Sequence, residues 1–212
     1  AWGESVSWYG SDPDQPVLAV CAGVAGAIYA YTALGEVTID LAAVTDPYPC
    51  LLRLPTGRVI CYRWEDSGTD HQVRAWYSDD AGLTWTESGP VLLEPLDGSA
   101  GGYPDRRRLR AVYCESDGTI ALFAHVLAAD TGTGIWRDRV AQWASSDGGW
   151  TFTLVTVSDG SDEEHAGSWI DVCMWRGEIV LARLITSSAL ATSTIRIRRL
   201  PSAWYPWTSG EE

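Results

Sequence analysis

The chain has 212 residues, of which 46% are hydrophobic and 20% are charged, and its formal net charge is −13. These values indicate a folded chain with a sizeable core and exclude general disorder, and no apolar run reaches the roughly 18 residues needed to span a membrane. An acidic surface repels phosphate backbones, so we expect no nucleic-acid partner, and we expect no membrane insertion.

A hairpin pattern recurs along the chain. An apolar strand, a tight turn with a glycine and a second apolar strand appear together three times. The copies are Pro49–Glu65, Leu109–Leu127 and Trp169–Thr186. Their turn glycines, Gly57, Gly118 and Gly177, are about 60 residues apart, and glycine supplies the positive φ of such a turn. A fourth, weaker copy is Val17–Ala33, with Gly26 at its turn.

A second pair of strands follows each hairpin. Gln72–Ser78 and Arg139–Ser145 alternate as strands do, and both end in the same turn. Four strands per 60-residue unit without helical periodicity predict an all-β fold, a β-propeller of four-stranded antiparallel blades. A β-sandwich would lack the repeated hairpin-plus-turn module. We expect one domain or segment with four blade units, approximately 10–46, 47–104, 105–164 and 165–212.

Two turns share the pattern Ser-x-Asp-x-Gly-x-Thr-aromatic. The residues are Ser78, Asp80, Gly82, Thr84 and Trp85 in one turn, and Ser145, Asp147, Gly149, Thr151 and Phe152 in the other. An Asp side chain can accept backbone N–H bonds within such a loop, and Gly adopts backbone conformations closed to other residues. We therefore interpret both turns as structural, rather than as metal sites or general acids.

This turn resembles the Asp box of sialidases, bacterial neuraminidase repeats and sortilin-like receptors. The resemblance covers Tyr48 to about Ser158 and implies a propeller whose Asp boxes lie on the rim, away from the catalytic face. A third box near Leu200–Thr208 is degenerate, because Pro and Trp replace Asp and Gly. The first unit is short or incomplete. Because sialidases have six blades, the chain is either a compact four-unit array or, as we favour, part of a larger propeller or assembly.

The resemblance also implies an Arg-Ile-Pro motif about ten residues before the first hairpin glycine. The window before Gly57 contains Pro47 but no arginine, and Arg53-Leu54-Pro55 begins six residues too late. A substrate carboxylate would therefore lack its arginine clamp. We assign no catalytic residue, no metal site and no cofactor.

Charged and aromatic residues at the starts of two predicted inner strands form a candidate ligand-binding surface. They are Arg106, Arg108, Arg110, Asp162, Glu163, His165 and Trp169. Arg108 lies ten residues before Gly118, at the strand end where the resemblance places ligands, and the acidic run precedes the last inner strand. The alternative for both groups is a solvated strand entry or loop.

The five cysteines form an odd set without a C-x-x-C pair. Cys114 and Cys173 each lie four residues before a turn glycine, and Cys21 lies near the same place in the fourth copy. Cysteines at equivalent places in successive blades are too far apart to pair. We therefore predict reduced, mostly buried thiols.

These observations favour a non-catalytic recognition or assembly propeller. Its partners would be a glycan or cell-surface receptor and other protein subunits, and its place an extracellular or virion surface such as a phage tail or fibre. The alternative is an exo-glycosidase resembling sialidase, whose remaining catalytic residues are unrecognised or lie outside this chain. A structural spacer is the third hypothesis. Under the first hypothesis, sialosides and simple aryl glycosides are not hydrolysed.

Overall fold

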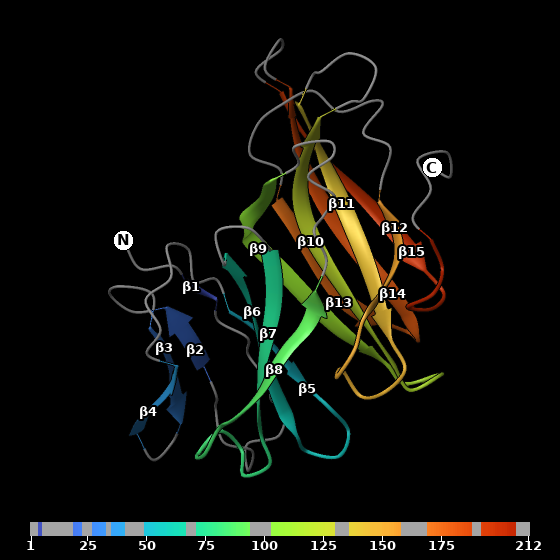
Figure 1. Ribbon diagram of the computed structural model, residues 1–212. Coiled ribbons are helices and arrows are strands. Elements are labelled where there is room, and N and C mark those ends of the chain that lie inside the picture. The colour runs from blue at the N-terminus through green and yellow to red at the C-terminus, as the bar shows by residue number, and fades with distance from the viewer. Residues whose placement is uncertain are drawn as a thin grey trace. The chain divides into compact units, whose positions relative to one another are not determined.

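The computed structural model of the chain consists of four antiparallel β-sheets (Figure 1). It describes residues 4–5, 19–22, 27–32, 35–40, 49–66, 71–93, 103–129, 136–157, 169–187 and 192–206. The chain divides into two compact units, unit 1 from Ala1 to Leu93 and unit 2 from Glu94 to Glu212. None of the described residues forms a helix long and apolar enough to cross a membrane.

Each unit contains two sheets, and in every sheet the strands are neighbours in chain order. The first sheet consists of β1 (Glu4–Ser5), β2 (Ala19–Ala22), β3 (Ile28–Thr32) and β4 (Gly35–Asp40). The second consists of β5 (Cys50–Arg53), β6 (Val59–Asp66), β7 (His71–Ser78) and β8 (Thr86–Leu93). The third consists of β9 (Tyr103–Cys114), β10 (Thr119–Ala129), β11 (Trp136–Ser145) and β12 (Thr153–Val157). The fourth consists of β13 (Trp169–Trp175), β14 (Glu178–Ser187) and β15 (Thr192–Leu200).

The repeated glycine turns join the first two strands of the second, third and fourth sheets. Gly57, Gly118 and Gly177 have φ values of 91°, 72° and 83°, a region that residues with a Cβ rarely occupy. The Gly57 and Gly118 N–H groups donate to carbonyl oxygens at 2.9 Å and so close their turns. The predicted four-stranded antiparallel unit is confirmed in the second and third sheets.

The first sheet departs from the predicted alignment of the repeats. The sequence pattern matches Val17–Ala33 to the hairpins that join the first and second strands of a blade. In the structure, β2 and β3 of this segment are the second and third strands, because Glu4 and Ser5 pair with Cys21 and Val20. The first sheet therefore contains four short strands, with β1 only two residues long.

Apolar side chains between consecutive sheets form a core in each unit. In unit 1, Ile28 and Ala30 of the first sheet pack with Leu51, Val59 and Cys61 of the second. In unit 2, the third sheet packs on the fourth through a larger set. Its fully or nearly fully buried members are Val112, Cys114, Ala121, Phe123, Val140, Ala144, Ile170, Ile179, Leu181, Leu200 and Ala203. Small residues in this set let the two sheets approach closely.

The cysteines only partly follow the prediction. Cys50, Cys61 and Cys114 are free and buried, but Cys173 is free and exposed. Cys173 was expected in the core because it occupies the same place as Cys114 relative to the turn glycine. The reason for the difference is that the fourth sheet covers the face on which Cys114 lies, whereas no described residue buries the corresponding face of the fourth sheet.

The turn between β7 and β8 is closed by side chains of its own eight residues. Ser78 Oγ donates to Asp80 Oδ1 at 2.8 Å and accepts from the Gly82 N–H at 2.7 Å. Asp80 also accepts from the Thr84 N–H at 2.8 Å and from the Thr84 hydroxyl at 2.6 Å. The Trp85 indole N–H donates to the Gly82 carbonyl at 2.9 Å. The hydrogen bonds from Thr84 and Ser78 lower the pKa of Asp80 to about 2.

The turn between β11 and β12 repeats this network. Ser145 Oγ donates to Asp147 Oδ1 at 2.7 Å and accepts from the Gly149 N–H at 2.9 Å. Asp147 accepts three further bonds, from the Trp150 N–H, the Thr151 N–H and the Thr151 hydroxyl. Burial raises the pKa of Asp147, but the bonds from Thr151, Ser145 and Trp150 outweigh it and lower the pKa to about 2.

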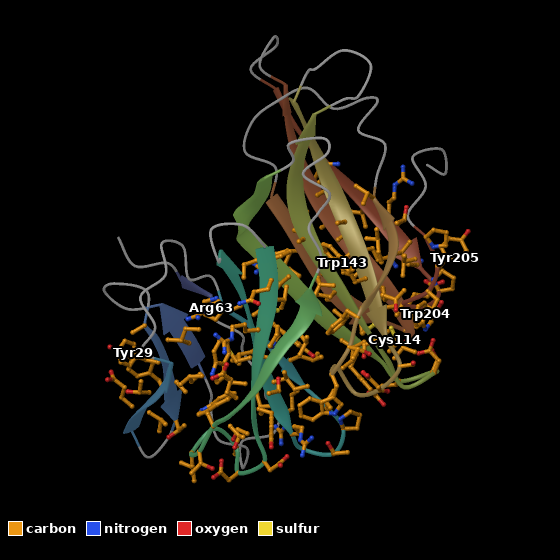
Figure 2. All side chains as sticks on the ribbon, viewed as in Figure 1. Tyr29, Arg63, Cys114, Trp143, Trp204 and Tyr205 are labelled. Carbon is orange, nitrogen blue, oxygen red and sulfur yellow. The ribbon has the colours of Figure 1, made fainter. Side chains whose placement is uncertain are left out.

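The turn after β15 replaces the Asp-centred network with a contact between sheets. Residues 200–205 occupy the position of the degenerate third box, and Tyr205 N–H donates to Ser202 O at 3.2 Å. The amide Nε2 of Gln142, a fully buried side chain on β11, donates to the carbonyls of Ala203 at 2.8 Å and Tyr205 at 2.9 Å. The third sheet therefore holds this turn of the fourth sheet in place. Trp204 and Tyr205 project from it at the edge of unit 2 (Figure 2).

We expect Asp147→Ala to destabilise the protein. The change removes four acceptor contacts from partly exposed groups, a loss of about 1–2 kcal/mol in the free energy of unfolding. The melting temperature should fall by about 2–8 °C for a chain of this size. Ser146→Ala, an exposed position in the same turn, is the matched control and should leave it unchanged. An equal effect of the two substitutions would contradict the structural role of Asp147.

The same carboxylates predict an acid dependence of stability. Their pKa of about 2 lies below the ordinary value of 3.8, so their contribution is present above pH 4 and is lost as the pH falls toward 2. Thermal melts between pH 2 and pH 5 should therefore show a steeper decline for the wild type than for the Asp80→Asn, Asp147→Asn double variant. Parallel curves would show that these two groups do not carry the dependence.

Candidate functional site

The first strands of the third and fourth sheets lie side by side in unit 2 (Figure 1). β9 opens the third sheet and β13 opens the fourth, and each runs toward its own glycine turn. In both sheets the first strand is an edge of the sheet, so its side chains are less enclosed than those of the second strand. This line of contact is the place where charged side chains of two sheets meet.

Arg110 and Asp171 form an ion pair across this line. Arg110 Nε donates to Asp171 Oδ1 at 3.0 Å, and the side chains are 29% and 78% exposed. The Val172 N–H donates to the same carboxylate oxygen at 3.1 Å. Arg110 Nη1 donates to the carbonyl of Leu109 at 3.1 Å, which fixes the plane of the guanidinium. The result is an oriented, solvent-facing carboxylate whose described hydrogen bonds use only one of its two oxygens.

Of the ligand-binding residues predicted from the sequence, the structure describes the side chain of only one. Arg110 is at the site and contacts Asp171. Arg106 and Arg108 lie on β9 and Trp169 begins β13, but the positions of these three side chains are not described. Asp162, Glu163 and His165 lie outside the described residues. Of the predicted set, the structure therefore brings Arg110 to the line where the two sheets meet.

Asp171 was missed by the sequence analysis, although the repeat contained a signal for it. The residue six positions before the turn glycine is Leu51 in the second sheet and Val112 in the third, and both are core residues. In the fourth sheet the same position is the exposed Asp171. A charge that interrupts an apolar repeat position indicates a role other than packing.

Two buried arginines occupy a second repeat position. Arg63 and Arg183 each lie six residues after a turn glycine, and they are 0% and 1% exposed. The Arg63 guanidinium stacks on the ring of Trp76, 4.9 Å from its centroid. Figure 2 shows Arg63 among the strands of unit 1. These cations are built into the sheets, so they do not add to the exposed charge beside Asp171.

Among the first-strand side chains that the structure describes on β5, β9 and β13, Asp171 is the only carboxylate. No group of three His, Cys, Asp or Glu residues within the described parts of the chain could hold a metal ion. The described geometry thus offers one carboxylate, oriented by a guanidinium and a backbone N–H. Such a group can accept a proton, attack an electron-poor carbon or stabilise positive charge.

No family model and no curated protein matches the chain. Its fold does match solved structures, at low sequence identity. The α-L-arabinofuranosidase Arb93A of Fusarium graminearum matches with a TM-score of 0.57 and 12% identity, over 96% of this chain and 67% of that one. A family 117 glycoside hydrolase of Zobellia galactanivorans matches with a TM-score of 0.51 and 12% identity, over 76% and 53%. The β-fructofuranosidase BmSUC1 of Bombyx mori matches with a TM-score of 0.50 and 12% identity, over 94% and 45%.

These matches show the fold, which is that of propeller glycosidases, and the chain spans about half the length of the first structures it matches. They overturn the preference for a non-catalytic recognition or assembly propeller, because the similar structures with a stated activity are glycosidases. That preference depended on a missing arginine clamp. The clamp serves a substrate carboxylate, and arabinofuranosides and fructofuranosides carry none, so its absence does not exclude catalysis on this fold.

Proposed function

We propose that the chain forms part of an exo-acting glycoside hydrolase whose sugar substrate binds where β9 and β13 meet. The observation that carries this proposal is the Arg110–Asp171 pair, an exposed carboxylate held on the first strand of a propeller-type sheet. The likeness in fold to an arabinofuranosidase and a fructofuranosidase supports it. Fold alone would not assign an activity, so the proposal depends on this site.

Asp171 is suited to a defined part of glycoside hydrolysis. The transition state carries positive charge on the anomeric carbon and ring oxygen, and a nearby carboxylate stabilises it or forms a bond to the carbon. Arg110 and the Val172 N–H both bond to Oδ1. The described contacts therefore leave Oδ2 for the substrate. Arg110 acts as a positioning residue, because it fixes the carboxylate and lies on the neighbouring strand.

Hydrolysis by this route needs a second carboxylic group, which donates a proton to the leaving oxygen. The sequence supplies acids at positions 162–164, five to seven residues before β13 begins, and we propose that one of Asp162, Glu163 and Glu164 has this role.

The substrate that we propose is a neutral sugar rather than a sialoside. A sialic acid carboxylate needs charge-assisted bonds from arginines. Arg110 already donates its Nε–H to a protein carboxylate, and Pro47 stands where the resemblance to sialidases implies the first clamp arginine. We also propose that the two Ser-x-Asp turns are Asp boxes of the sialidase type. Their Ser–Asp–Thr networks support this, and they serve the scaffold rather than the reaction.

The test is hydrolysis of a panel of glycosides. An aryl α-L-arabinofuranoside, an aryl β-D-galactoside and the fructofuranoside sucrose are the neutral substrates, and an aryl sialoside is the acidic comparison. We expect turnover of at least one neutral substrate and none of the sialoside. Asp171→Asn should lower kcat by about 100-fold or more, since a carboxylate in acid–base or charge stabilisation contributes at least this factor. The Asp171→Asn melting temperature should change by less than about 3 °C, because exposed ion pairs contribute about 0–1 kcal/mol.

Glu115→Gln is the matched control, an exposed carboxylate in the glycine turn after β9, and it should leave kcat unchanged. Asp162, Glu163 and Glu164 should be substituted one at a time. The proton donor is the residue whose variant loses activity on substrates with a poor leaving group but keeps it on substrates with an activated leaving group, because an activated leaving group needs no proton. Turnover that persists in Asp171→Asn would exclude this carboxylate from the reaction, and the lack of turnover on every neutral substrate would refute the proposed activity.

A further inference from the structure

Two consecutive aromatic residues are exposed on the turn after β15. Trp204 and Tyr205 are 43% and 38% exposed, and Figure 2 shows both at the edge of unit 2. Pro201 precedes this pair and Pro206 follows it, and each proline ring fixes one backbone φ. Single apolar residues are common on protein surfaces, but two large aromatic side chains on one short, stiff turn indicate a contact surface.

The exposed position recurs in the turns that follow the third strands of the last three sheets. Five residues after the ends of β7, β11 and β15 lie Leu83, Trp150 and Tyr205, which are 39%, 39% and 38% exposed. The preceding residue is the glycine of the Ser-x-Asp pattern in the first two turns and Trp204 in the third. The third turn has therefore lost the scaffold pattern and carries a second exposed aromatic ring beside the first.

The third sheet holds this turn in one conformation. Nε2 of Gln142, whose side chain is fully buried, donates to the carbonyls of Ala203 at 2.8 Å and Tyr205 at 2.9 Å. Ala203 is itself fully buried in the core between the third and fourth sheets. The backbone on both sides of Trp204 is therefore fixed before a ligand arrives. A preorganised surface loses less conformational entropy on binding, which favours affinity.

The size and the charge of this surface decide what can bind to it. A Trp or Tyr side chain buries roughly 150–250 Å² when it is fully covered, so two that are about 40% exposed offer roughly 120–200 Å². A stable protein interface needs roughly 800 Å² from each partner. The net charge of −13 repels nucleic acids and acidic polymers. A neutral sugar ring fits, because its C–H groups pack on the negative face of an aromatic ring while its hydroxyls stay in water.

We infer that Trp204 and Tyr205 form a second sugar-binding site, which holds a neutral polysaccharide by ring stacking and takes no part in bond cleavage. This site is separate from the one at Asp171. The register aligns Gln142, Phe123 and Arg110 in one row across β11, β10 and β9. Gln142, which holds the turn, is thus two strand spacings, or roughly 10 Å, from Arg110. A single sugar ring therefore cannot contact both sites.

The test is affinity electrophoresis of the native protein in gels that contain arabinan, levan or β-1,3-galactan. Every protein in the test carries Asp171→Asn, which removes the proposed reaction. We expect at least one polysaccharide to slow migration, and we expect the Trp204→Ala, Tyr205→Ala double variant to raise its Kd by about 10-fold or more, because stacking on two rings is lost. No retardation by any of the three polysaccharides would overturn the inference. Retardation of a protein whose wild type hydrolyses no glycoside would refute the proposed function and support this inference.

Leu83→Ala is the matched control, because Leu83 has the same place and the same exposure in the turn after β7. It should leave the Kd unchanged, and an equal loss in this variant would overturn the assignment to Trp204 and Tyr205. Replacement of both aromatic residues by Phe keeps two flat rings and should hold the Kd within about threefold. The melting temperature of the double Ala variant should change by less than about 3 °C, since Gln142 bonds to backbone carbonyls. A dimer that dissociates in the double Ala variant would identify a second copy as the occupant and would overturn the inference.

Discussion

A β-sheet that is apolar on both faces must be covered on both faces, and the architecture of this chain depends on that requirement. The second sheet meets it fully, since Leu51 and Cys61 face one way and Leu52 and Tyr62 the other, and all four are buried. Because successive side chains of a strand point to opposite faces, each strand of such a sheet contacts one neighbouring layer with its odd residues and another with its even residues. Sheets with two apolar faces stack, and a stack of twisted four-stranded sheets is the arrangement that the propeller fold uses.

The parts of this architecture that sequence predicts well are those fixed by local bonds. The hairpins follow from glycines with positive φ, and the Ser-x-Asp turns follow from hydrogen bonds that span at most four residues. The first sheet was misaligned because a two-residue strand, Glu4–Ser5, pairs with residues 15 or more positions away. The exposure of Cys173 was missed for a related reason, since repeat position predicts which way a side chain points but not whether another sheet lies there.

The candidate site was harder to predict from the sequence than the turns, because it depends on contacts between sheets. Arg110 could be named from its charge and its place at the start of a predicted inner strand, although β9 itself begins at Tyr103. Its partner Asp171 is 61 residues away on another sheet, so the pair exists only once the two sheets are stacked in register. The functional prediction was wrong because it depended on the arginine clamp of one family. A clamp is needed only where the substrate is an anion, whereas most hydrolases of neutral glycosides use a pair of carboxylic groups that flank the scissile bond.

Three aspartates of this chain illustrate how hydrogen bonding separates structural from chemical roles. Asp147 accepts four bonds over both oxygens, and Asp80 accepts three, so their lone pairs are used within the turn. Asp171 accepts two described bonds, both on Oδ1, with a side chain that is 78% exposed. A carboxylate that stabilises a reaction must be fixed in direction yet keep an oxygen for the substrate. In the described part of unit 2, both oxygens of the Asp147 carboxylate accept hydrogen bonds within the turn. The Asp171 carboxylate is held in one orientation, and its described hydrogen bonds involve one oxygen only.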